Sequence, residues 1–162
     1  LGKAIKVAND QIRRKAGEDV SLYGMGTTMV AATLMGHYLQ VANVGDSRLY
    51  IINDEIRQIT RDHSLVEEMV RMGGMDETTA RNHPARTEVE VDFFNEELRP
   101  GDLILMCSDG LTNMLEDEEI LKIMKSAYTI REKALCLIDG ANEHGGKDNI
   151  AVIIIDAFAK DI

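Results

Sequence analysis

The sequence predicts an α+β fold, in which antiparallel strands are layered with helices. Strand-like segments occur in groups joined by short turns, which favours antiparallel pairing. Helical patterns cluster at the start of the chain and near its end instead of alternating with the strands, which disfavours a parallel doubly wound sheet. With 162 residues, 44% of them hydrophobic, the chain can form one domain with a real core, or most of a larger one.

The first part of the chain predicts one helix followed by an antiparallel meander. Residues 3–15 place apolar side chains on one helical face and charges on the other. From residue 27 the pattern changes to short apolar strands, with turns at Gly36-His37 and Asn53-Asp54. The predicted strands are 27–34, 38–44, 49–52 and 56–59.

The second part predicts more strands and two further helices after an irregular stretch. Residues 64–72 show a helical pattern that ends at a glycine pair. We expect 76–87 to be an exposed, mobile excursion, because it has little apolar surface to bury. A capping-box pattern marks the start of the last helix at Thr129. The predicted strands are 88–94, 102–107 and 149–157, and the predicted helices begin near 117 and at 129.

Composition narrows the classes of function. A net charge of −10 disfavours a surface for nucleic acid or anionic membrane, because phosphate binding needs basic patches. No apolar run approaches membrane-spanning length. Cys107 and Cys136 lie in apolar patterns and are expected to be buried thiols without a disulfide, which favours the cytoplasm. Leu1 is not a natural initiator, so we expect the start of the gene product to be missing.

Three aspartates stand at predicted strand ends, each in a motif with glycine. Asp109 follows an apolar strand in Ser-Asp-Gly, and Asp148 precedes the last strand in Gly-Gly-Lys-Asp-Asn. Asp46 lies in Gly-Asp-Ser-Arg, again at a strand end. An aspartate there is costly to desolvate unless a positive group meets it, and glycine lets such a group approach closely. Because oxygen-only ligands favour Mg²⁺ or Mn²⁺ over zinc, the three motifs together predict a hard-cation site.

Each aspartate also has a simpler interpretation. Asp109 alone fits equally well a turn that bonds its own backbone. Asp148 alone fits better a loop that caps the final strand, and Asp46 alone fits better a hairpin turn that pairs it with Arg48. The four histidines form no i,i+4 pair, so solvated or capping roles are expected for them and not a zinc site.

Five short motifs occur in an order that resembles the metal-dependent protein phosphatases of the PP2C family, in particular the bacterial serine/threonine branch. Each motif alone is weak, but the five in this order are highly specific, and together they span nearly the whole chain. The motifs are Gly-Met-Gly-Thr-Thr at 24–28, Val-Ala-Asn-Val-Gly-Asp-Ser-Arg at 41–48, Thr-Arg-Asp-His-Ser-Leu at 60–65, Cys-Ser-Asp-Gly-Leu-Thr at 107–112 and Gly-Gly-Lys-Asp-Asn at 145–149.

The resemblance implies a four-layer αββα sandwich, with two antiparallel sheets between helices and a metal centre at one end. It aligns Asp109 and Asp148 with the ligands of two core ions, Mn²⁺ or Mg²⁺, and Asp46 with a weakly held third ion. It also implies that 1–162 belong to one phosphatase domain, with 63–87 as a flap beside the active site. The implied substrates are proteins that a serine/threonine kinase has phosphorylated, and the implied reaction is hydrolysis of their phosphoserine and phosphothreonine.

The chain departs from the family pattern at three places. An amino-terminal Asp-Gly-x-Gly-Gly element that bridges both metals in the family has no counterpart here, so we expect the amino-terminal strands to be missing. The stretch 83–87 is short relative to the family, which suggests a break between Arg86 and Thr87. Asn113 stands where some members place another acidic ligand, which weakens the third site.

The leading hypothesis is hydrolysis of phosphoserine and phosphothreonine by a two-metal centre that activates a water molecule. The missing amino-terminal ligands keep open a non-enzymatic alternative, a catalytically incomplete fragment or pseudophosphatase that acts as a regulatory or interaction module. A third, weaker hypothesis is a related phosphatase that controls a sigma-factor regulator. The sequence identifies no substrate-binding residues.

Overall fold

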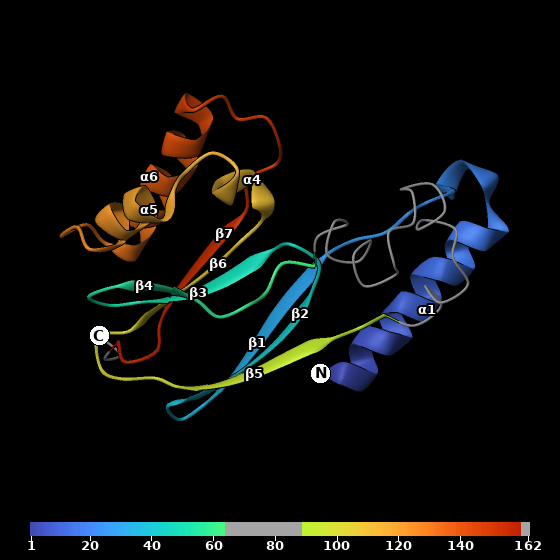
Figure 1. Ribbon diagram of the computed structural model, residues 1–162, viewed down its shortest axis with the longest axis horizontal. Helices are drawn as coiled ribbons and strands as arrows, with labels where there is room; N and C mark the ends of the chain where they lie inside the picture. Colours follow the sequence, from blue (N-terminus) through green and yellow to red (C-terminus); the bar gives the residue numbers. More distant parts are fainter. Residues whose placement is uncertain (64–88, 160–162) are drawn as a thin grey trace, which may run out of the picture.

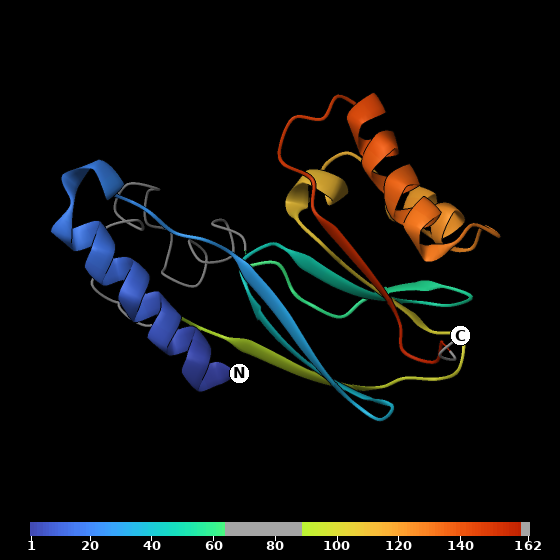
Figure 2. The same cartoon turned by 180° about the vertical axis from the view of Figure 1, so that it is seen from behind.

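The computed structural model describes residues 1–63 and 89–159 (Figures 1 and 2). The predicted helix 64–72 and the predicted excursion 76–87 lie outside the described residues. Within them, no helix has both the length and the apolar composition needed to cross a membrane. The elements are α1 (Gly2–Glu18), the 3₁₀ turn η1 (Val20–Leu22), β1 (Met29–Met35), β2 (Tyr38–Val44), β3 (Arg48–Ile52), β4 (Ile56–Gln58), β5 (Asp92–Glu97), β6 (Leu103–Cys107), α4 (Asp109–Thr112), α5 (Asp117–Met124), α6 (Ile130–Glu143) and β7 (Val152–Asp156).

The strands form two antiparallel sheets with helices on their outer sides. One sheet has the order β1-β2-β5 and the other the order β4-β3-β6-β7. In both views α5 and α6 lie on the outer side of the four-stranded sheet, and α1 lies on the other side of the molecule, beside β1 and β5 (Figures 1 and 2). Gly2 of α1 is so close to β5 that an added Cβ would lie 2.8 Å from Phe93 Cζ. The predicted α+β sandwich is therefore confirmed.

The predicted meander is wrong at the connection between β2 and β3. These strands lie in different sheets, so the short turn at 45–47 carries the chain from one sheet to the other. The reason is the shared core: Leu39 and Val41 of β2 face the same inter-sheet core as Leu49 and Ile51 of β3. Two strands that cover one core from opposite sides cannot also be neighbours in a single sheet.

Two smaller differences concern strand bounds and a missed helix. The strand predicted at 88–94 is observed at Asp92–Glu97, because it pairs with β2 as far as the partners Tyr38 and Glu97. This pairing overrides the low strand propensity of the two glutamates at its end. The sequence did not predict the short helix α4, which starts at Asp109 directly after β6.

The two central strands of the larger sheet are buried on both faces. Along β3, Leu49 and Ile51 face the inter-sheet core, whereas Tyr50 and Ile52 face a second core under the helices. Strand side chains alternate between faces, so one strand can serve two cores only if nearly all its residues are apolar. The second core consists of Tyr50, Ile52, Leu105, Cys107, Leu111, Leu115, Ile120, Met124, Leu137 and Ala141.

The two cysteines are both free, as the sequence predicted. Cys107 is buried at the end of β6, and Cys136 is partly buried on α6. Burial raises the pKa of the Cys107 thiol to about 12. Since the thiolate is the reactive form, Cys107 behaves as a small core side chain and not as a nucleophile.

Two leucines on α6 give a direct test of the second core. Leu137 is completely buried, whereas Leu135 is 50% exposed on the same helix. Leu137→Ala is expected to reduce the free energy of unfolding by about 2–5 kcal/mol, because it leaves a cavity. Leu135→Ala should change it by about 0.5 kcal/mol or less. Urea unfolding of both variants measures the difference, and equal losses would contradict the placement of α6 against the sheet.

Candidate metal site

Strand register brings the three aspartate motifs to one end of the larger sheet. Arg48 at the start of β3 is opposite Cys107 at the end of β6, and Cys107 is opposite Val152 at the start of β7. Neighbouring strands lie about 4.8 Å apart, so this row of three residues is short. The segments that carry Asp46, Asp109 and Asp148 therefore all adjoin the same end of the sheet.

A serine hydroxyl joins the two segments that carry Asp109 and Asp148. Ser108 Oγ donates to the carbonyl of Asn149 at 3.0 Å and accepts from the N–H of Ala151, also at 3.0 Å. The Ser108 N–H donates to the Ala151 carbonyl at 3.1 Å. These three bonds hold Ser108, the residue before Asp109, against Asn149 and Ala151, which follow Asp148.

Gly110 makes this approach sterically possible. A Cβ at this position would lie 2.3 Å from the Asn149 carbonyl oxygen and 3.5 Å from the carbonyl carbon of Asp148. Real Cβ atoms do not tolerate the first of these distances. The glycine of the Ser-Asp-Gly motif is thus required by the close packing of one aspartate-bearing backbone on the other.

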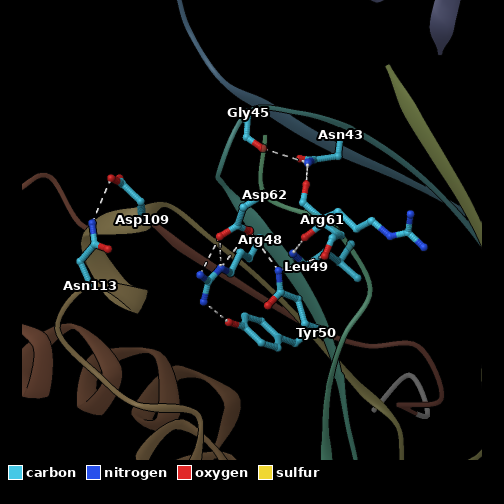
Figure 3. A network of polar contacts seen from close by, with 11 residues as sticks. Asn43, Gly45, Arg48, Leu49, Tyr50, Arg61, Asp62, Asp109 and Asn113 are labelled. Atoms are coloured by element: carbon cyan, nitrogen blue, oxygen red, sulfur yellow. Dashed lines mark hydrogen bonds and ion pairs between the residues drawn. The ribbon is translucent and has the colours of Figure 1, made fainter. Parts of the chain in front are cut away.

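The carboxylates of Asp109 and Asp148 form local hydrogen bonds but meet no cationic side chain among the described residues. Asp109 Oδ2 accepts from Asn113 Nδ2 at 3.2 Å (Figure 3), and Asp148 Oδ1 accepts from the N–H of Asn149 at 2.7 Å. Asp109 is partly buried and Asp148 is exposed. The local bonds expected for turn aspartates are present, yet each carboxylate keeps oxygen lone pairs free for a further ligand.

The simpler interpretation of Asp46, a pair with Arg48, is wrong. The Arg48 guanidinium binds Asp62 instead, with Nη2 2.6 Å from Oδ2 and Nε 3.0 Å from both carboxylate oxygens (Figure 3). Arg48 Nη1 also donates to the Tyr50 hydroxyl at 3.0 Å. Asp62 raises the pKa of Arg48, so the guanidinium stays charged. The partly buried Asp46 carboxylate has no hydrogen bond or ion pair with any described residue.

Sequence reasoning missed a polar network at the crossing between the sheets. Asn43 is completely buried, and its Nδ2 donates to the carbonyls of Gly45 at 3.1 Å and Arg61 at 3.0 Å (Figure 3). His63, for which a solvated or capping role was expected, accepts from the Gly45 N–H and contacts Asp92. The only sequence signal was that Asn43, Gly45, Arg61 and His63 fall within the motifs at 41–48 and 60–65, and nothing in the sequence indicated Asp92.

The donor set fits a hard divalent cation. Asp109 and Asp148 offer oxygen ligands on backbones held in contact, and Asp46 lies at the same end of the sheet with no partner among the described residues. Oxygen ligands of this kind suit Mg²⁺ or Mn²⁺, which complete their coordination with water or substrate oxygens. Within 1–63 and 89–159 no three His, Cys, Asp or Glu side chains form a metal-sized cluster, so a metal bound here would need further ligands beside these residues.

Gly110→Ala tests the contact between the two aspartate-bearing segments. The added methyl group would overlap the Asn149 carbonyl, so we expect a loss of about 1–3 kcal/mol of folding free energy. Gly140→Ala on α6 is the matched control, because its Cβ would meet only Leu115 at 3.6 Å, an ordinary contact. That variant should gain up to about 1 kcal/mol from helix propensity. Thermal unfolding compares the two, and a neutral Gly110→Ala would show that the segments are not in contact.

Comparison with known proteins agrees with the fold and the motifs. The family model for protein phosphatase 2C matches residues 2–135. The serine/threonine phosphatase stp of Listeria innocua is 43% identical over 167 aligned positions, which cover 96% of this chain and 66% of that protein. PstP of Mycobacterium tuberculosis is 35% identical over 99% of this chain and 33% of its own length. The chain thus spans just under two thirds of the length of the Listeria relative.

Solved structures of related phosphatases have the same fold as this chain. The serine/threonine phosphatase Stp1 of Staphylococcus aureus superposes with a TM-score of 0.80 at 36% identity, over 94% of this chain and 65% of that one. The catalytic domain of PstP in complex with two manganese ions superposes with a TM-score of 0.78 at 34% identity, over 94% of this chain and 68% of that one. The chain belongs to the protein phosphatase 2C family.

Proposed function

We propose that this chain is part of a metal-dependent phosphatase that hydrolyses phosphoserine and phosphothreonine in proteins. The observation that carries the proposal is the bridge from Ser108 to Asn149 and Ala151, which holds the backbones of Asp109 and Asp148 together. The names of the related proteins, serine/threonine phosphatases of Listeria and Mycobacterium, support this substrate class.

In this proposal Asp109 and Asp148 hold two Mn²⁺ or Mg²⁺ ions, and Asp46 holds a third ion more weakly. The two manganese ions in the related PstP catalytic domain support the choice of metal. When bound, such ions supply a hydrolytic water and positive charge for the phosphoryl group. The chain itself contributes the spacing: the Ser108 bonds and the glycine at 110 hold the backbones that carry the two aspartates close together, with no cationic side chain of the described residues paired to either carboxylate.

The proposal also covers the domain bounds, the substrates and the cellular compartment. We assign 1–162 to one phosphatase domain, with 63–87 as a flap-like segment, and we expect the substrates to be products of a serine/threonine kinase. The net charge of −10 favours protein substrates over nucleic acid. The two free cysteines favour a location in the cytoplasm, where thiols stay reduced.

The second candidate function is a module with the fold but without catalysis. It is favoured by one observation, that the described part of the chain brings together no three metal-ligating side chains. Hydrolysis of a phosphopeptide at saturating Mn²⁺ by the wild-type protein separates the two candidates. Turnover supports the phosphatase, and binding of phosphoproteins without turnover supports the module.

Asp109→Ala is expected to reduce kcat/KM for a phosphothreonine peptide by about 100-fold or more, because a lost metal ligand costs several kcal/mol in the transition state. Asp139→Ala is the matched control, an exposed aspartate on α6 outside the site, and should leave kcat/KM unchanged. The assay is release of phosphate across a Mn²⁺ titration. Near-wild-type turnover of Asp109→Ala at saturating Mn²⁺ would remove Asp109 from the site.

A further inference from the structure

Both backbone polar groups of Gly45, the residue after β2, are hydrogen-bonded by His63, and its carbonyl is also bonded by the side chain of Asn43. The Gly45 N–H donates to His63 Nδ1 at 3.3 Å, and the Gly45 carbonyl accepts from the His63 N–H at 3.1 Å and from Asn43 Nδ2 at 3.1 Å. Its φ of +98° is in the region that favours glycine, and an added Cβ would lie 2.5 Å from Thr28 Cγ2. The position of the Gly45 backbone is therefore set by these hydrogen bonds and by Thr28. Because Asp46 is the next residue, its backbone position is constrained as well.

The contacts of His63 define its tautomer. Nδ1 accepts from the Gly45 N–H, so it carries no proton. In a neutral ring the proton is then on Nε2, which lies 3.1 Å from Asp92 Oδ2 and can donate to it. In the other tautomer the ring N–H would face the Gly45 N–H, and Nε2 would face the carboxylate as a second acceptor. Asp92 thus selects the form of His63 that can hold Gly45.

This pair is anchored to the rest of the fold. Asp92 starts β5 and is the strand partner of Asn43 in β2, the same asparagine that binds the Gly45 carbonyl. The His63 and Asp92 side chains are 30% and 34% exposed, so their geometry is largely set by the protein. The Asp92 carboxylate on β5 is therefore linked to the loop between β2 and β3 through the imidazole ring of His63.

We propose that His63, oriented by Asp92, is a positioning residue that holds Asp46 in place for its metal ion. The inference rests on the proposed function of Asp46 as a metal ligand. Groups that hold a metal ligand from behind by hydrogen bonds commonly set its orientation, and their loss typically costs about 10–100-fold in metal affinity or activity. Here the pair acts one residue away, through the backbone of Gly45, and does not touch the ion.

The first measurement is the tautomer of His63 in the wild-type protein, from ring-nitrogen NMR. The proposal requires the proton on Nε2. The Asp92→Asn variant replaces an acceptor-only carboxylate by an amide that can either accept from Nε2 or donate to it, so the preference for the Nε2–H tautomer and the bond from Gly45 should both weaken. A wild-type ring with its proton on Nδ1 overturns the proposal, whether or not any variant folds.

The second measurement is a titration with diamagnetic Mg²⁺ without substrate, followed by chemical-shift changes of the backbone amide signals at 45–47, which report mainly on an ion bound in direct contact. Asp92→Asn and His63→Ala should each raise the Mg²⁺ concentration for the half-maximal shift change by about tenfold. The signals around Asp109 and Asp148 should respond as in the wild type. An unchanged response at 45–47 in folded variants overturns the proposal and leaves the proposed function intact.

A second histidine–carboxylate pair supplies the matched control. His37 Nε2 lies 3.4 Å from Glu97 Oε1, at the end of β2 opposite to Gly45. Glu97→Gln should leave the Mg²⁺ response at 45–47 unchanged, and an equal weakening would overturn the proposal. No Mg²⁺-dependent shift change at 45–47 in the wild type would overturn both the proposal and the assignment of Asp46. Failure to hydrolyse phosphopeptide would instead count against the proposed function, because neither NMR measurement uses substrate.

Discussion

Burial of β3 and β6 on both faces is the constraint on which the rest of the structure depends. Their paired residues serve the inter-sheet core on one side and the helix-covered core on the other. A shift of this register by one residue would exchange the two faces, moving each side chain into the other core. The register is therefore strongly determined, and with it the alignment of Arg48, Cys107 and Val152 at one end of the sheet. The apolar pairing of β3 with β6 therefore determines where the segments of the candidate site lie.

The crossing from one sheet to the other creates a different requirement. Backbone groups at the crossing cannot find partners in either strand ladder, and a buried group without a partner costs about 1–3 kcal/mol. Side chains take the place of the missing ladder: Asn43 binds two carbonyls, and Thr60 Oγ1 accepts from the Leu49 N–H at 3.0 Å. One buried acceptor, Asn43 Oδ1, is left without a partner among the described residues. The polar side chains in these motifs thus have a structural reason beside any role in metal binding.

Local pattern was sufficient to predict most elements and the fold class. Alternating apolar residues indicated strands such as 38–44, and a Thr129 capping box indicated α6; the structure has both. The sequence also indicated that the segments carrying the three aspartates adjoin one end of a sheet, since this needs only the strand ends and antiparallel pairing. That the carboxylates themselves share a metal site stays a prediction.

What could not be predicted depends on contacts between distant residues. Whether β2 and β3 pair or separate is decided by the shared core and not by the turn between them. The partner of Arg48 is Asp62, 14 residues along the chain, and not the aspartate two residues before it. The Ser108 bridge spans 41 residues to Asn149, and the function of Gly110 is visible only once that contact is known.

Diffraction at the manganese absorption edge tests the central claim most directly, that Asp109 and Asp148 share one hard-cation site. Crystals of the protein grown with saturating Mn²⁺ should show anomalous density within about 2–2.5 Å of a carboxylate oxygen of each aspartate, the distance range for hard cations with oxygen ligands. Manganese density that contacts neither carboxylate, or only one of them, in otherwise well-ordered crystals would contradict the account.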